Sequence, residues 1–338
     1  MAEPVQNERR DDPALPEPQK RDAAESAVVD GHLYLFGGWS ITARGHLVRN
    51  EIWTMNVGVG PSPRRWIRRL AGGRTIPPAC NGARCVVVDE MIYSYGGQKP
   101  DGGHLGIVYR LDPKKMEWIE VATPIEENCP APPPRANCCL CSIGSRLVMF
   151  GGRCCKFPRD RLQCGAMEEN WWTNDVYEFE LDKRRESGRW LGLELSGQRP
   201  RPLQFAAMAA IDRCRAFLFG MDIDDNSYSV VLNLYARSWS TIDFDVKPHP
   251  RFGHTICQWE TEEKSLCVLV GGCSIRASGA VYVLDIDGCK AHKINVGQEF
   301  NDAMFATSHC VQNKDKTFDV LVYAYGLKIV HLGLDIAY

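Results

Sequence analysis

Six cysteines stand close together in the sequence, and two of them have the C-x-x-C spacing of zinc ligands. They are Cys138, Cys139, Cys141, Cys154, Cys155 and Cys164. The stretch "NCCLCSI", which holds the first three, alternates like a β-strand, and residues three apart in a strand point to opposite faces. Cys138 and Cys141 therefore cannot clamp one metal ion. We expect buried free thiols at these positions and no cofactor in the chain.

An acidic segment offers a second possible metal site. Asp222, Asp224 and Asn226 match positions one, three and five of a calcium-binding loop. Position six is Ser227 where glycine is required, and position twelve is Asn233 where glutamate is required. We therefore expect a solvated acidic loop. The sequence also lacks the common hydrolase, metalloprotease and nucleotide-binding motifs, so we expect no catalysis.

Arginine and tryptophan side chains offer binding chemistry instead. Guanidinium groups bind carboxylates and phosphates through paired hydrogen bonds, and tryptophan is a frequent anchor in interfaces. We expect a partner-binding site in which arginines clamp an anion and tryptophans anchor apolar groups. Its predicted members are Arg135, Arg153, Trp171, Trp172, Arg201 and Arg251. Two alternatives stay open: the arginines bond neighbouring carbonyls or acids, and the tryptophans pack beneath a loop.

The scaffold that positions these residues is built by repetition. Six strand-like runs reach a glycine, namely "HLYLFGG", "MIYSYGG", "RLVMFGG", "RAFLFGM", "SLCVLVGG" and "LVYAYGL". Their first glycines are 51 to 69 residues apart, at Gly37, Gly96, Gly151, Gly220, Gly271 and Gly326. Self-similarity at a period of this size indicates a solenoid, a propeller or an array.

Each unit contains up to four strand-like runs. One run precedes the glycine run, and a second alternating run such as "DVYEFEL" follows it. A further run opens with a tryptophan in four units, at Trp66, Trp118, Trp190 and Trp239. Four antiparallel strands repeated six times in a ring predict an all-β, six-bladed β-propeller. The sixth unit stops after "KIVHLGLDIAY", so we expect an incomplete last blade.

The strand order also predicts where a partner binds. Connections from the second to the third strand of a blade, and from one blade to the next, open on the same face of the ring. The longest of these is the segment 153–173, which we expect to be a loop that carries Trp171 and Trp172. Loops held by a rigid scaffold commonly carry binding residues.

The repeats resemble the kelch repeat. The resemblance rests on the diglycine after an aliphatic and aromatic strand, the run Asn174-Asp175-Val176-Tyr177 and the later tryptophan. It covers about residues 25–338, and we expect residues 1–24 to be a disordered lead. The implied fold is a kelch β-propeller.

Several stretches are similar to the kelch-domain-containing group of ubiquitin-ligase substrate receptors. They are "VVDGHLYLFGG", "IPPACNGARCVVVDEMIYSYGG", "WWTNDVYEFELD" and "RFGHTICQWETEEKSLCVLVGGC". The resemblance implies capture of a protein or peptide with an acidic or carboxylate group, and cullin-RING ligase components as further partners. Only Arg153 matches the arginine that this group carries after a diglycine, and the sequence shows no BTB, F-box or ligase-docking segment.

Composition limits the other partners. The 40 basic and 42 acidic residues leave a net charge of −2, which does not favour nucleic acid or an anionic membrane. The 15 cysteines without a secretory signal predict a reducing compartment, so we expect a cytoplasmic or nuclear protein. The function that we predict is non-catalytic protein binding. The alternatives are a metal-dependent propeller enzyme and a cytoskeletal scaffold.

Overall fold

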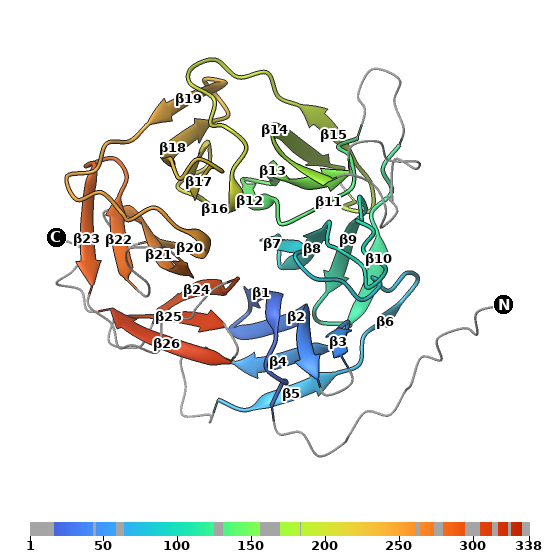
Figure 1. Cartoon of the computed structure of the whole chain (residues 1–338). Coiled ribbons are helices and arrows are strands. Elements are labelled where there is room, and N and C mark those ends of the chain that lie inside the picture. Colours follow the sequence, from blue (N-terminus) through green and yellow to red (C-terminus); the bar gives the residue numbers. More distant parts are fainter. Residues whose placement is uncertain are drawn as a thin grey trace.

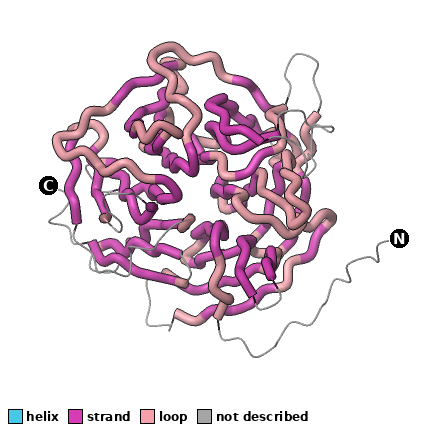
Figure 2. The backbone as a smooth tube through the Cα atoms, in the orientation of Figure 1, coloured by secondary structure: helices cyan, strands magenta, loops and turns pink. Residues whose placement is uncertain are grey.

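A computed structural model places strands throughout the chain (Figure 1, Figure 2). It describes residues 17–42, 45–58, 64–124, 131–155, 170–182, 184–260, 264–273, 280–294, 305–312, 317–323 and 326–332. In this part of the chain the secondary structure is entirely strand, and no helix is long and apolar enough to cross a membrane.

The strands form six sheets, or blades, arranged around a central channel (Figure 1). Blade 1 contains β1 (Asp22–Val29), β2 (His32–Thr42), β3 (Gly45–Val48), β4 (Ile52–Asn56) and β5 (Trp66–Arg69). Blade 2 contains β6 (Gly72–Gly73), β7 (Arg84–Val88), β8 (Met91–Tyr95), β9 (Val108–Asp112) and β10 (Glu117–Glu120). Blade 3 contains β11 (Arg135–Ala136), β12 (Cys139–Ile143), β13 (Arg146–Cys155), β14 (Asn170–Leu181) and β15 (Gly188–Gly192).

The second half of the ring has simpler sheets. Blade 4 contains β16 (Gln204–Ala210), β17 (Arg215–Met221), β18 (Ser227–Asn233) and β19 (Ser238–Thr241). Blade 5 contains β20 (Phe252–Glu260), β21 (Ser265–Cys273), β22 (Val281–Asp285) and β23 (Lys290–Ile294). Blade 6 contains β24 (Thr307–Gln312), β25 (Phe318–Tyr323) and β26 (Leu327–Leu332). The six-bladed, all-β prediction is confirmed, and the last blade has three strands within the described residues.

The blades pack together through a repeated aromatic contact. An aromatic residue near the end of the second strand of one blade packs against the tryptophan on the outer strand of the next blade. The pairs are Phe36 with Trp118, Tyr95 with Trp190, Phe150 with Trp239, and Tyr323 with Trp66, with ring centroids 4.9 to 6.0 Å apart. The tryptophans that the sequence places on outer strands are therefore the joints between blades.

The glycine repeats lie where the second strand leaves the core. Gly151 and Gly152 both have positive φ, of 59° and 100°. A Cβ on Gly152 would lie 2.9 Å from the Cα of Cys138, so only glycine fits this approach of two backbones. The diglycine does not end the strand in blades 1, 3 and 5, because β2, β13 and β21 continue to Thr42, Cys155 and Cys273.

Two details concern the ends of the chain. β1 begins at Asp22, which is three residues before the boundary expected at residue 25, whereas residues 1–16 lie outside the described residues. Side chains join the first and last blades. Ser26 Oγ lies 2.9 Å from Thr307 Oγ1 and 2.8 Å from His309 Nε2, and Arg64 forms an ion pair with Asp319 at 2.8 Å. Within the described residues, the ring closes through these contacts without a shared strand.

Candidate functional site

Three arginines occupy the same buried position at the entrance to a blade. We call Arg21, Arg135 and Arg251 the entrance arginines. In each, Nε donates to the carbonyl two residues earlier, and Nη1 donates to the carbonyl of the first glycine of the diglycine. The acceptors are Gln19 and Gly37, Pro133 and Gly151, and His249 and Gly271, respectively. Each arginine therefore ties the chain entering a blade to the blade's second strand.

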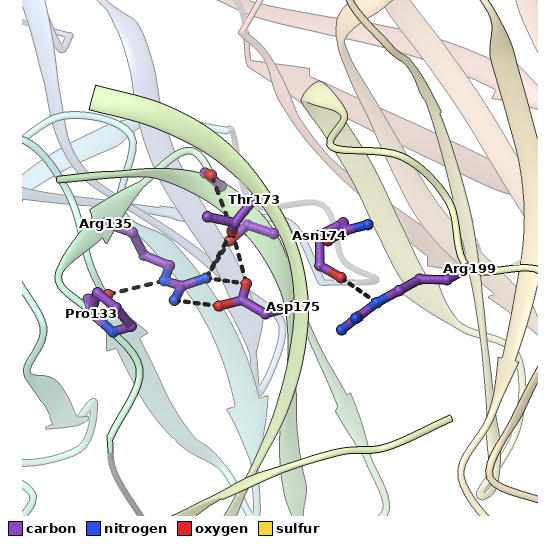
Figure 3. Close-up of polar contacts among 8 residues, drawn as sticks. Pro133, Arg135, Thr173, Asn174, Asp175 and Arg199 are labelled. Atoms are coloured by element: carbon purple, nitrogen blue, oxygen red, sulfur yellow. Dashed lines mark hydrogen bonds and ion pairs between the residues drawn. The ribbon is translucent and has the colours of Figure 1, made fainter. Parts of the chain in front are cut away.

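Arg135 is fully buried and saturated with hydrogen bonds (Figure 3). Its Nη1 and Nη2 donate to the two carboxylate oxygens of Asp175 at 2.6 and 2.9 Å. Burial acts to lower the pKa of Arg135, but the hydrogen bonds and charge of Asp175 raise it above its ordinary value. Thr173 donates to the same carboxylate at 2.8 Å. The prediction that Arg135 belongs to a surface anion clamp is therefore wrong, because its hydrogen-bond donors are used inside the blade.

Arg251 is also buried, but among the described residues no acid pairs with it. The position that holds Asp175 in blade 3 is Ala280 in blade 5, where Arg251 Nη1 donates to the backbone carbonyl at 2.8 Å. Its buried Nη2 has no hydrogen-bond partner within the described residues, and burial lowers the pKa of the Arg251 guanidinium. The guanidinium lies 5.3 Å from the ring centroid of Tyr282. The prediction that Arg251 is a surface clamp is also wrong, because this side chain is buried and bonds backbone carbonyls.

Arg201 lies on the surface but is paired within the chain. Its Nη1 lies 2.8 Å from Asp224 and 3.8 Å from Asp222. The second aspartate also accepts hydrogen bonds from Asn226 and from the Tyr228 hydroxyl, at 3.1 Å to Oδ2 in each case. For Arg201 the geometry therefore shows the alternative in which the arginine bonds neighbouring acids.

Arg153, Trp171 and Trp172 lie together on the hairpin of β13 and β14. Arg153 is opposite Trp172, and Cys154 is opposite Trp171 in the strand register. This corrects the expected loop 153–173 at both ends, because both tryptophans belong to β14; residues 156–169 lie outside the described residues. The Trp171 side chain is exposed, and Trp172 is half-buried. Arg153 and Trp172 are strand partners and share one face of the hairpin, whereas Trp171, the next residue along β14, lies on the other face.

The structure adds aromatic residues that the sequence analysis did not include. Trp172 meets the ring of Phe205 in an edge contact, with centroids 4.8 Å apart. Phe205 in turn meets Phe305 at 4.8 Å and Phe252 at 6.3 Å. Four blades contribute to this group, so no short motif reveals it. The available signal was phenylalanine at a blade entrance where blades 2, 3 and 5 have glycine or asparagine.

The channel beneath this group has a volume of about 420 Å³ and is lined by all six inner strands. Arg84 and Glu25 form an ion pair across it at 2.7 Å, and Arg84 Nε donates to the Cys138 carbonyl at 3.0 Å. Burial raises the pKa of Glu25, an effect that the charge of Arg84 opposes. Within the described residues, no group of three histidine, cysteine or acidic side chains is arranged to hold a metal ion.

Comparisons with known proteins agree with this architecture. A family profile for the KLHDC2/KLHL20/DRC7 Kelch-repeats domain matches residues 9–152. Kelch domain-containing protein 1 of Homo sapiens is 27% identical over 264 residues, which cover 71% of this chain and 61% of that protein. Kelch domain-containing protein 2 of Homo sapiens is 27% identical over 217 residues, which cover 57% and 49%. Host cell factor 1 of Homo sapiens is 26% identical over 247 residues, which cover 66% and 11%.

The glycine repeats, the ring of blades and these matches support a kelch β-propeller. The aligned regions cover 61% and 49% of the two kelch domain-containing relatives, so the likeness concerns the propeller rather than the whole of those proteins.

Proposed function

We propose that this propeller is a non-catalytic module that binds a protein or peptide through the face carrying Arg153, Trp171 and Trp172. The observation that carries the proposal is the state of Arg153. Its Nη2 donates to Gln98 Oε1 at 2.9 Å, its Nε is buried without a partner, and no carboxylate pairs with it within the described residues. Burial lowers the pKa of this guanidinium, so a partner carboxylate would relieve an uncompensated charge.

The neighbours of Arg153 suit a peptide partner. The half-buried Trp172 is the strand partner of Arg153, so a cation and an apolar ring are adjacent, and the exposed Trp171 is the next residue on the same strand. Aromatic side chains and arginine dominate the energetics of many interfaces. The kelch-domain relatives support the general class of interaction module.

A peptide-display selection tests this function. The full chain would be presented with a random twelve-residue library, and binding of the selected peptides would be measured by biolayer interferometry. We expect enrichment of aspartate, glutamate or a free C-terminal carboxylate, and loss of that enrichment for Arg153→Gln. Arg201→Gln is the matched control, because that surface arginine already has Asp224 as a partner. Equal selection by the wild type and Arg153→Gln would contradict the proposal.

A narrower part of the proposal is recognition of substrates for a cullin-RING ubiquitin ligase, in the cytoplasm or nucleus. Its support is the resemblance of the repeats to the kelch-domain-containing substrate receptors. Immunoprecipitation of the tagged chain from cells, probed for cullins, tests this part separately. Absence of any cullin would remove the ligase role and leave peptide binding in place.

A further inference from the structure

The mouth of the channel is a ring of six residues with left-handed backbone. In blades 1, 2, 3 and 5, the residue before the diglycine pairs with an inner-strand residue, and the ring member lies two positions before that inner-strand residue. In blades 4 and 6 the ring member lies at the matching place relative to the inner strand. The six are Ala23, Gly82, Asn137, Phe205, Gly253 and Phe305, with φ between 47° and 68°. The same backbone bend therefore starts every blade, whatever its side chain.

Backbone hydrogen bonds connect successive members of this ring. The amide of Gly82 donates to the carbonyl of Ala23, and the amide of Asn137 donates to the carbonyl of Gly82, at 3.2 and 2.8 Å. The amide of Phe305 donates to the carbonyl of Gly253 at 2.7 Å. The bend is thus part of the joint between blades and is fixed by the fold.

Phenylalanine is an unfavourable choice for this bend. Left-handed backbone suits glycine and is tolerated by asparagine, which are the residues in blades 2, 3 and 5, whereas a bulky side chain there is strained. Phe205 and Phe305 nevertheless occupy it and lie in edge contact, centroids 4.8 Å apart. Retained strain of this kind gathers at functional sites.

The two phenylalanines form a half-buried apolar group beside a cation. With Trp172 and Phe252 they make four rings in contact, all half-buried. Arg153 is the strand partner of Trp172, and no carboxylate pairs with it within the described residues. The rings and a positive charge without a carboxylate partner among the described residues therefore lie side by side at the channel mouth.

We propose that the aromatic group of Trp172, Phe205, Phe252 and Phe305 receives one large apolar side chain of a peptide whose neighbouring residue is acidic and pairs with Arg153. This rests on the proposed peptide-binding function and adds the side chain that the partner must supply. The charge of Arg153 selects the acidic neighbour, and the rings select the anchor.

The test uses two double variants of the full chain, Phe205→Gly with Phe305→Gly and Phe205→Asn with Phe305→Asn. Glycine and asparagine are the residues that other blades use at this bend, so the backbone should be retained and Tm should fall little or rise. The same twelve-residue library would be selected on the wild type and on both variants. We expect the wild type to enrich phenylalanine, tryptophan, leucine or isoleucine within two positions of an acid. We expect both variants to lose that apolar preference and to bind the selected peptides at least about tenfold more weakly.

Ala23→Gly is the matched control. It changes a left-handed ring position in blade 1 without removing an aromatic ring, so binding should be unchanged. Enriched peptides that bind both double variants as tightly as the wild type would overturn the inference and leave the proposed function intact. Failure of the wild type to enrich any peptide would overturn both. A large fall in Tm for both double variants with unchanged apolar selection would show that the rings only stabilise the fold.

Discussion

Arg135 in blade 3 and Arg251 in blade 5 occupy equivalent positions in differently charged surroundings. Arg135 has Asp175 as a two-oxygen partner, whereas the equivalent of that aspartate beside Arg251 is Ala280. Three residues after each arginine, blade 3 has Cys138 and blade 5 has His254. Burial lowers the pKa of Arg251, whereas at Arg135 the effect of burial is outweighed by the hydrogen bonds and charge of Asp175, which raise the pKa.

The difference shows that the bonds to backbone, rather than the ion pair, define this position. Both arginines bond the same two carbonyls, those of the residue two positions earlier and of the first glycine. The carboxylate is an addition that blade 3 has and blade 5 lacks. An arginine used in this way is a structural residue, in contrast to Arg153, which has no carboxylate partner among the described residues.

The largest effect is expected from Arg135→Ala. The change removes the guanidinium that donates to Asp175 and to the carbonyl of Gly151. Loss of one member of a buried ion pair costs about 3–5 kcal/mol. Urea unfolding of the purified chain measures it. Arg201→Ala, which removes an exposed ion pair with Asp224, should cost at most about 1 kcal/mol. Similar losses for the two variants would contradict the structural role of Arg135.

The next effect concerns pH and His254. Burial, with the charge of Arg251, lowers the pKa of His254 to about 3 from its ordinary 6.5. The unfolded chain therefore binds this proton more readily between the two values, so stability falls as pH falls from about 6.5 toward 3, by up to about 1.4 kcal/mol per pH unit.

His254→Cys, which introduces the residue of blade 3, should flatten this dependence. Thermal unfolding between pH 7 and pH 4 gives the slope for both proteins. Part of the slope should remain, because burial also lowers the pKa of His104 and His309 to about 4. An unchanged slope would show that His254 does not control it.

The smallest effect is expected from Ala280→Asp, which gives blade 5 the missing acid. A carboxylate that accepts from the unpartnered Nη2 of Arg251 should stabilise the fold by about 1–2 kcal/mol at neutral pH. The arginine would depress the new carboxyl's pKa, so the gain is lost as pH falls through that folded-state value. Ala280→Asn, with similar size and no charge, is the comparison. Equal stability of the two variants would argue against a charge effect.

Much of the fold follows from the spacing of six glycine runs, but only part of the site does. Arg153, Trp171 and Trp172 were assigned to one loop of blade 3, whereas the strand register places them on the paired strands β13 and β14. Arg135 could not be assigned to the interior from its proline-rich segment. Its bonds to Gly151 and Asp175 lie 16 and 40 residues further along the chain.

The repeat, the strand order and the glycine positions follow from the amino-acid pattern alone, because they depend on local alternation and backbone freedom within one blade. Which arginines are buried and which aromatic rings meet depends on the assembled ring. Arg135 turns inward because carbonyls and a carboxylate of other strands lie within reach. Trp172, Phe205 and Phe305 meet because closing the ring brings three blades to one channel mouth, a contact that no spacing along the chain encodes.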